Sequence, residues 1–73
     1  MKKSFLLEDL DCANCAAKME RAIAALPDVT RVTVSFMAQK LVLEAPDDRF
    51  DAVLAAAQEC IRKVEPDCRV IVK

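Results

Sequence analysis

Two stretches of helical periodicity, each followed by a proline, divide this chain into short segments and restrict its fold. The first covers residues 12–26, and its apolar residues share one helix face: Ala16, Met19, Ile23 and Leu26. Pro27 follows directly, and proline is poorly tolerated inside a helix. The second stretch has the same spacing in Phe50, Val53, Leu54, Ala57, Ile61 and Val64. We predict that it begins with Asp47 or Asp48 as N-cap and ends near Glu65, before Pro66.

Four shorter segments flank these helices and are typical of β-strands: residues 4–10, 29–36, 41–45 and 68–72. The second alternates most clearly, with Val32, Val34 and Phe36 on one face. A polar turn, Met37–Lys40, joins the second and third segments into a predicted hairpin. The turn has no glycine, and its composition is compatible with a type I geometry.

The order strand–helix–strand–strand–helix–strand predicts an α+β sandwich, in which a four-stranded antiparallel sheet carries both helices on one face. Right-handed crossovers predict the spatial order fourth, first, third, second strand. In that topology residues 11–15, 37–40 and 65–68 lie at one end of the molecule. With 73 residues the chain is expected to form a single domain, residues 1–73.

Composition excludes several classes of function. The chain has no histidine and no glycine, so histidine-based catalysis and glycine-rich phosphate loops are absent. A net charge of −1 and the absence of tyrosine and tryptophan argue against nucleic-acid binding. No apolar run approaches the ~20 residues of a membrane span, so membrane insertion is not expected. Glu8 and Asp9 interrupt the N-terminal apolar run too early for a secretory signal, and we expect a cytoplasmic location.

Cys12 and Cys15 form a Cys-x-x-Cys pair where the first helix begins. Backbone N–H groups and the helix dipole lower thiol pKa values at such a position. Because the thiolate is both a metal ligand and a redox nucleophile, this argument alone does not choose between them. Three interpretations stay open: a metal site, a dithiol oxidoreductase, and two small residues that are incidental to a turn.

The segment LDCANCAAKMERAIAALPDVTRVTVSF resembles the heavy-metal-associated domain. This ferredoxin-like module occurs as copper chaperones, as mercury-binding proteins and as N-terminal domains of heavy-metal P-type ATPases, and the resemblance covers nearly the whole chain. It implies that Cys12 and Cys15 bind the metal. Copper-handling members usually have Gly-Met-Thr before the first cysteine, whereas this chain has Asp9, Leu10 and Asp11. Asp11 is similar to the third ligand of the ATPases that export zinc, cadmium and lead.

Charge counting independently favours a divalent ion. Cu(I) bound by two thiolates is already an anion, and Asp11 would double its charge. Zn(II) bound by two thiolates is neutral, and an oxygen ligand suits it better than Cu(I). Zinc takes about four ligands, so three protein ligands leave one position for a receiving thiolate. The alternative for Asp11 is a carboxylate that caps the helix without touching metal.

We therefore predict a non-catalytic module that binds Zn(II), Cd(II) or Pb(II) through Asp11, Cys12 and Cys15. The module would pass the ion on by ligand exchange, and its partners would be the transmembrane or other domains of a metal-transporting P-type ATPase. The alternatives are a copper(I) chaperone or a mercury-binding protein and, in another class, the dithiol oxidoreductase.

Five further residues have a functional and a simpler interpretation. Cys68 is a fourth ligand or a thiol at the core edge, and the second is favoured. Cys60 is expected to pack or to be incidentally exposed, and Met37 is a soft donor or a surface residue. Glu65 and Asp67 would add negative potential beside the metal, or would simply be solvated.

Overall fold

The computed structural model describes residues 1–71 and has the predicted order of elements. They are β1 (Lys2–Glu8), α1 (Ala13–Ala24), β2 (Arg31–Ser35), β3 (Lys40–Glu44), α2 (Phe50–Val64) and β4 (Arg69–Ile71). Their ends differ from the predicted ends by one or two residues in most cases. The first strand ends at Glu8 because Asp9 has a φ of 62°, which interrupts the extended backbone. Val72, predicted in the last strand, lies outside the described residues.

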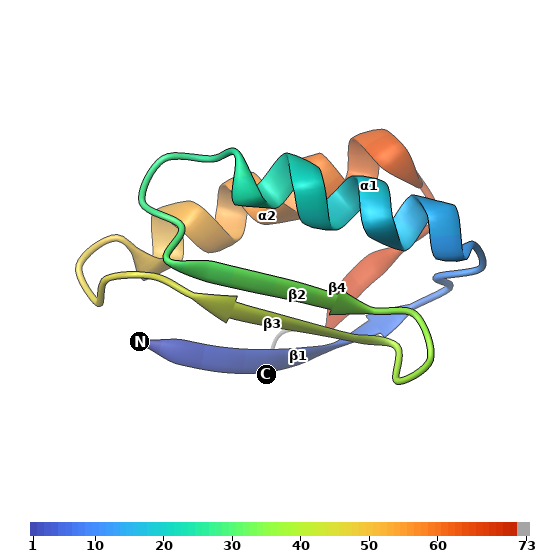
Figure 1. Ribbon diagram of the computed structural model, residues 1–73, viewed down its shortest axis with the longest axis horizontal. Coiled ribbons are helices and arrows are strands. Elements are labelled where there is room, and N and C mark those ends of the chain that lie inside the picture. Colours follow the sequence, from blue (N-terminus) through green and yellow to red (C-terminus); the bar gives the residue numbers. More distant parts are fainter. Residues whose placement is uncertain (72–73) are drawn as a thin grey trace.

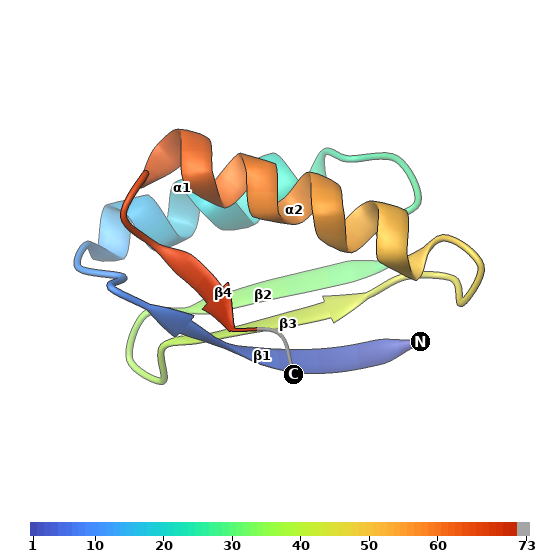
Figure 2. The ribbon, with the colours of Figure 1, turned by 180° about the vertical axis from the view of Figure 1, so that it is seen from behind.

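The four strands form one antiparallel sheet in the order β2-β3-β1-β4. Both helices cover the same face of this sheet, as Figures 1 and 2 show from opposite sides. The predicted architecture and strand order are therefore confirmed. The two helix crossovers bring the β1–α1 loop and the β2–β3 turn to the same end of the molecule (Figure 1).

The core lies between the sheet and the helices. Phe5 and Leu7 of β1 alternate with exposed neighbours, as residues of a sheet with one buried face should. The largest fully buried side chains come from both layers: Met19, Ile23, Leu41, Leu43 and Ile61. Every buried residue in the described part of the chain is apolar or a cysteine. Burial of such side chains stabilises the fold by roughly 1.5–3 kcal/mol each.

The prediction that Asp47 or Asp48 caps the second helix is wrong. The N-cap of α2 is Arg49, whose N–H donates to the carbonyl of Pro46 at 3.0 Å. This turn, residues 46–49, delays the start of the helix beyond both aspartates. The carbonyl of Arg49 then accepts the first helical hydrogen bond, from Val53, at 2.9 Å.

Glu20 links α1 to the edge of the sheet. Its Oε2 accepts a hydrogen bond of 2.9 Å from the backbone N–H of Val34, and the side chain is half-buried. This N–H belongs to an edge strand and points away from β3, so a carboxylate from the helix takes the place of a neighbouring strand. Glu20 therefore lies on the side of α1 that faces β2, and its carboxylate is not a freely solvated surface group.

Substitution of Glu20 by alanine should lower the free energy of unfolding by about 1–2 kcal/mol, because a hydrogen bond to a charged acceptor is lost. Glu20→Gln retains an acceptor oxygen at the same place and should lose less than half of that amount. Urea unfolding of the reduced, metal-free protein measures both values. Equal midpoints for the native protein and Glu20→Ala would show that this hydrogen bond contributes nothing to stability.

Candidate metal site

The cysteine loop joins β1 to α1 and places its two thiols on the first helical turn. Cys12 is the N-cap of α1, and its carbonyl accepts the N–H of Ala16 at 3.0 Å. Because Cys15 lies three residues later, the turn brings it back over Cys12. The Cys12 sulfur accepts hydrogen bonds from the backbone N–H and from the thiol of Cys15. Both cysteines are half-buried and unoxidised.

The two thiols have opposite pKa shifts. The backbone N–H of Cys15 and then its thiol stabilise the thiolate of Cys12 and lower the pKa of Cys12 below its ordinary value. The hydrogen bond with Cys12, desolvation and a hydrogen bond with Glu65 together raise the pKa of Cys15 to about 11. Of the two thiols, Cys12 therefore loses its proton more readily and is the first sulfur available to bind a cation as a thiolate.

Glu65 is the carboxylate that the structure brings against the cysteine pair. It follows the last residue of α2, its carbonyl accepts the N–H of Cys68 at 3.0 Å, and its side chain accepts a hydrogen bond from the Cys15 thiol. Burial raises the pKa of the Cys68 thiol, and the charges of Glu65, Asp9 and Asp11 add to this effect. Glu65 thus adds negative potential to the site, and Cys68 is a buried thiol at the core edge.

Asp11 is exposed and stands directly before Cys12, at the open end of the helix. The N-cap of α1 is Cys12 rather than Asp11, so the alternative in which the Asp11 carboxylate caps the helix is wrong. Within residues 1–71, no group of three or more Cys, Asp or Glu side chains is close enough together to hold a metal ion. The structure brings the two cysteines together, but it does not place the Asp11 carboxylate beside them.

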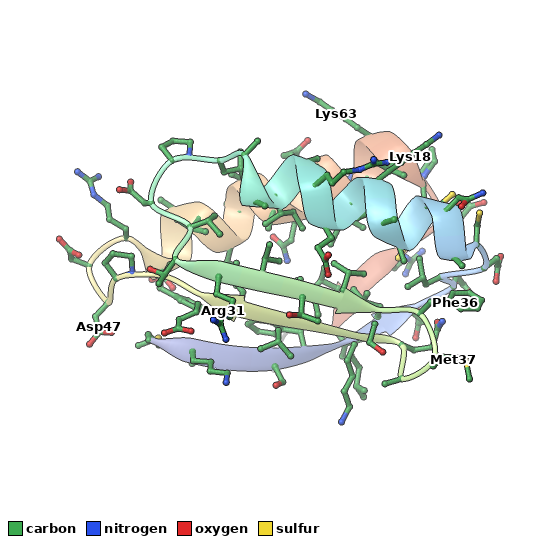
Figure 3. The ribbon with its side chains drawn as sticks, viewed as in Figure 1. Lys18, Arg31, Phe36, Met37, Asp47 and Lys63 are labelled. Atoms are coloured by element: carbon green, nitrogen blue, oxygen red, sulfur yellow. The ribbon has the colours of Figure 1, made fainter. Side chains whose placement is uncertain are left out.

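The predicted meeting of three loops is confirmed by contacts between them. Glu65 touches Cys15, and the β2–β3 turn reaches the cysteine loop through Gln39, whose side-chain amide donates to the carbonyl of Leu10 at 2.8 Å. The same turn carries Met37, 91% exposed, beside Phe36 at this end of the molecule (Figure 3). Sequence reasoning missed Gln39, because a glutamine in a turn carries no spacing signal for a contact 29 residues away.

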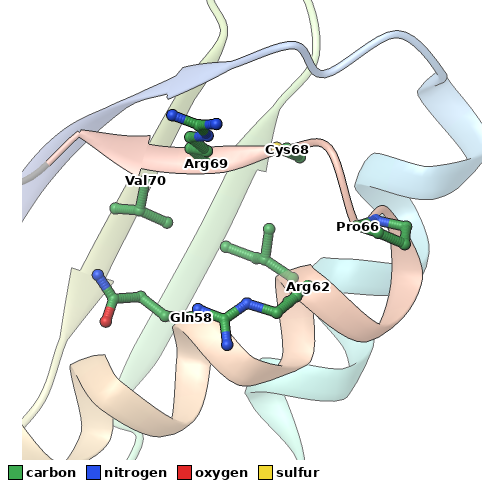
Figure 4. A pocket seen from close by; sticks show the side chains of 7 residues that line it. Gln58, Arg62, Pro66, Cys68, Arg69 and Val70 are labelled. Carbon is green, nitrogen blue, oxygen red and sulfur yellow. The ribbon is translucent and has the colours of Figure 1, made fainter.

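A groove of about 310 Å³ lies between α2 and β4, and neither Cys12 nor Cys15 lines it. Figure 4 shows Gln58 and Arg62 of α2 facing Val70 of β4 and Cys68, which directly precedes that strand. Two arginines, Arg62 and Arg69, border the groove, so its charge does not suit a cation. Cys60 packs against the core, as predicted. In residues 1–71, neither helix combines the length and the apolar character needed to cross a membrane.

Comparison with known proteins gives consistent results. The family model for the heavy-metal-associated domain matches residues 4–66. The zinc/cadmium/lead-transporting P-type ATPase of Escherichia coli (strain K12) is 39% identical over 56 residues, which is 77% of this chain and 8% of that protein. The cadmium, zinc and cobalt-transporting ATPase of Bacillus subtilis (strain 168) is 26% identical over 70 residues, which is 96% of this chain and 10% of that protein. This chain spans a tenth or less of the length of these relatives.

Among solved structures, the yeast copper transporter domain Ccc2a superposes with a TM-score of 0.73 at 15% identity, covering 97% of this chain and 94% of that one. At this identity the likeness shows the fold alone, and it confirms the ferredoxin-like arrangement. Domains of this family are metal-binding and chaperone modules that are not catalytic on their own. The match over residues 4–66 decides between the binding module and the dithiol oxidoreductase, and this chain belongs to the heavy-metal-associated domain family.

Proposed function

We propose that this protein captures a soft divalent cation, Zn(II) or its relatives Cd(II) and Pb(II), through Asp11, Cys12 and Cys15. The observation that carries the proposal is the cysteine pair that converges at the start of α1 with a carboxylate directly before it. Two thiolates and one carboxylate give Zn(II) a set of sulfur and oxygen ligands that it accepts readily. Asp11 stands one residue from Cys12, so a change in its backbone and side-chain angles is enough to direct it to a bound ion.

The ion is the cargo of the domain rather than a resident cofactor. Three protein ligands leave one coordination position of Zn(II) open, and a thiolate from a receiving site can enter there before a donor ligand leaves. The similarity to zinc- and cadmium-transporting ATPases supports a role as one domain, residues 1–73, of such a pump. There it would lie on the cytoplasmic side and exchange metal with the other domains of the ATPase.

Copper is the competing cargo. The copper transporter domain shares only the fold with this chain, and the charge of Asp11 and Glu65 disfavours a monovalent ion that two thiolates already make anionic. Cu(I) nevertheless binds strongly to any close pair of thiolates, so an affinity for Cu(I) is not a discriminating measurement. The change in Zn(II) affinity when Asp11 is removed distinguishes the two cargoes.

The native protein should bind one Zn(II), and Asp11→Ala should weaken that binding at least tenfold, about 1.4 kcal/mol, because an oxygen ligand is lost. Chelator competition on fully reduced protein, without oxygen, measures the affinity and the stoichiometry. Asp9→Asn is the matched control: it removes the same charge two residues away, and asparagine also tolerates the positive φ of Asp9. Its effect should stay below threefold.

Two results would contradict this ligand set. If Asp11→Ala binds Zn(II) as tightly as the native protein, Asp11 is not a ligand, and the copper-chaperone alternative becomes the favoured function. If Glu65→Gln, instead of Asp11→Ala, weakens binding tenfold, the carboxylate already in contact with Cys15 is the ligand, and the assignment of Asp11 is wrong.

Zn(II) affinity should rise with pH. Cys15, with a pKa of about 11, keeps its proton at neutral pH, and the ion must displace that proton to bind the thiolate. Raising the pH removes the competing proton, so the apparent affinity should increase about tenfold or more for each unit between pH 7 and pH 9. Calorimetric titration in buffers of different ionisation enthalpy counts the protons directly, with at least one expected per ion. A release close to zero would show that both cysteines are already thiolates.

A further inference from the structure

Gln39 holds three hydrogen bonds at the boundary between the β2–β3 turn and the cysteine loop. Its carbonyl accepts the N–H of Leu7 at 2.7 Å. Its side-chain nitrogen Nε2 donates to the carbonyls of Leu10 and Phe36, both at 2.8 Å. We name this set of three bonds the Gln39 clamp. Both N–H groups of the amide are used, and the side chain is half-buried.

The Gln39 clamp binds the backbone on both sides of a sharp bend between β1 and the cysteine loop. Between Leu7 and Leu10 the backbone leaves the strand through Asp9, whose φ is 62°. A residue other than glycine in this left-handed region costs on the order of 1 kcal/mol, so such a bend needs support from its surroundings. Leu10, 3% exposed, is anchored in the core, and Gln39 fixes its carbonyl from the other side.

The first metal-site residue follows this anchored position immediately. Asp11 comes next after Leu10, and Cys12 after that already forms the N-cap of α1. The fixed carbonyl of Leu10 therefore determines where the chain enters the helix and how the first turn presents the two sulfurs. Gln39 itself has a φ of 55°, so the turn accepts an unfavourable backbone conformation while its side chain reaches the loop.

We propose that Gln39 is a positioning residue of the metal site: by holding the carbonyls of Leu10 and Phe36, it fixes the cysteine loop in the conformation that receives the ion. Gln39 touches no metal in this role. Preorganised ligands bind more tightly because less conformational freedom is lost on binding. The inference rests on the proposed metal binding, and its test separates the two.

The test compares Gln39→Ala with Asp28→Ala. Asp28 also has a positive φ, 69°, but lies in the α1–β2 loop at the opposite end of the molecule (Figure 1). Both variants place alanine in a left-handed conformation and should lose similar stability, whereas only the first removes the two side-chain hydrogen bonds of the clamp. Chelator competition should show Zn(II) binding at least tenfold weaker for Gln39→Ala and within twofold of native for Asp28→Ala.

A second measurement uses the metal-free protein. Amide hydrogen exchange of residues 11–15 should become at least tenfold faster in Gln39→Ala, while Asp28→Ala should leave these amides unchanged relative to the centre of the sheet. A uniform loss of stability would accelerate all amides alike. If Gln39→Ala does not fold, Gln39→Gly replaces it, because glycine adopts a φ of 55° without a Cβ clash.

The outcomes are distinguishable. If native protein binds no Zn(II), the proposed function fails, and exchange in the metal-free variants still tests the clamp. If native protein binds Zn(II) and Gln39→Ala binds it within twofold, or if residues 11–15 exchange at the native rate, the positioning role is wrong. If Asp28→Ala weakens Zn(II) binding as much as Gln39→Ala does, the weaker binding comes from the loss of stability. That result would also overturn the proposal.

Discussion

The inward side chains of β1 and β3 pack against both helices, and this contact decides where every loop of the molecule lies. Leu41 and Leu43 from the sheet and Met19, Ile23 and Ile61 from the helices are withdrawn from water almost completely. Since a shift of one residue in either strand would turn its apolar side chains to solvent, the register is strongly specified. With the register set and both helices on one face, the cysteine loop, the β2–β3 turn and the end of α2 have to meet at one end.

The elements and their arrangement could be predicted because they depend on periodicity and on proline. Pro27 and Pro66 limit the helices, and the alternation of Val32 and Val34 identifies a half-buried strand. The start of α2 could not be predicted in the same way. Asp47 and Asp48 are both good caps in isolation, and only the turn closed by Pro46 and Arg49 selects a different residue. Local preference is a weak guide where two neighbouring residues satisfy it equally.

The candidate site could be predicted only as far as its chemistry is local. Cys12 and Cys15 could be identified from their spacing, and the predicted topology correctly placed Glu65 near them. The contact of Glu65 with Cys15 and the hydrogen bonds of Gln39 depend on side-chain directions across three loops, which no spacing rule describes. A chain without glycine also has to make its tight bends with other residues. Asp9 and Gln39 do so here, and a polar side chain can support such a bend in ways that glycine cannot.

If the domain carries a metal ion as proposed, the different pKa values of its two thiols affect both capture and release of that ion. In the proposed metal site, Cys12 is the sulfur that more readily becomes a thiolate and would contact the cation first, and Cys15 would bind once its proton leaves. In the proposed transfer, a receiving thiolate would displace Cys15 from the ion, and the Cys15 sulfur would then take up a proton at neutral pH because its pKa is about 11. A protonated thiol no longer competes for the metal. Under the proposed function, the hydrogen bonds from Cys15 to Cys12 and Glu65 would oppose capture of the ion and would help its release.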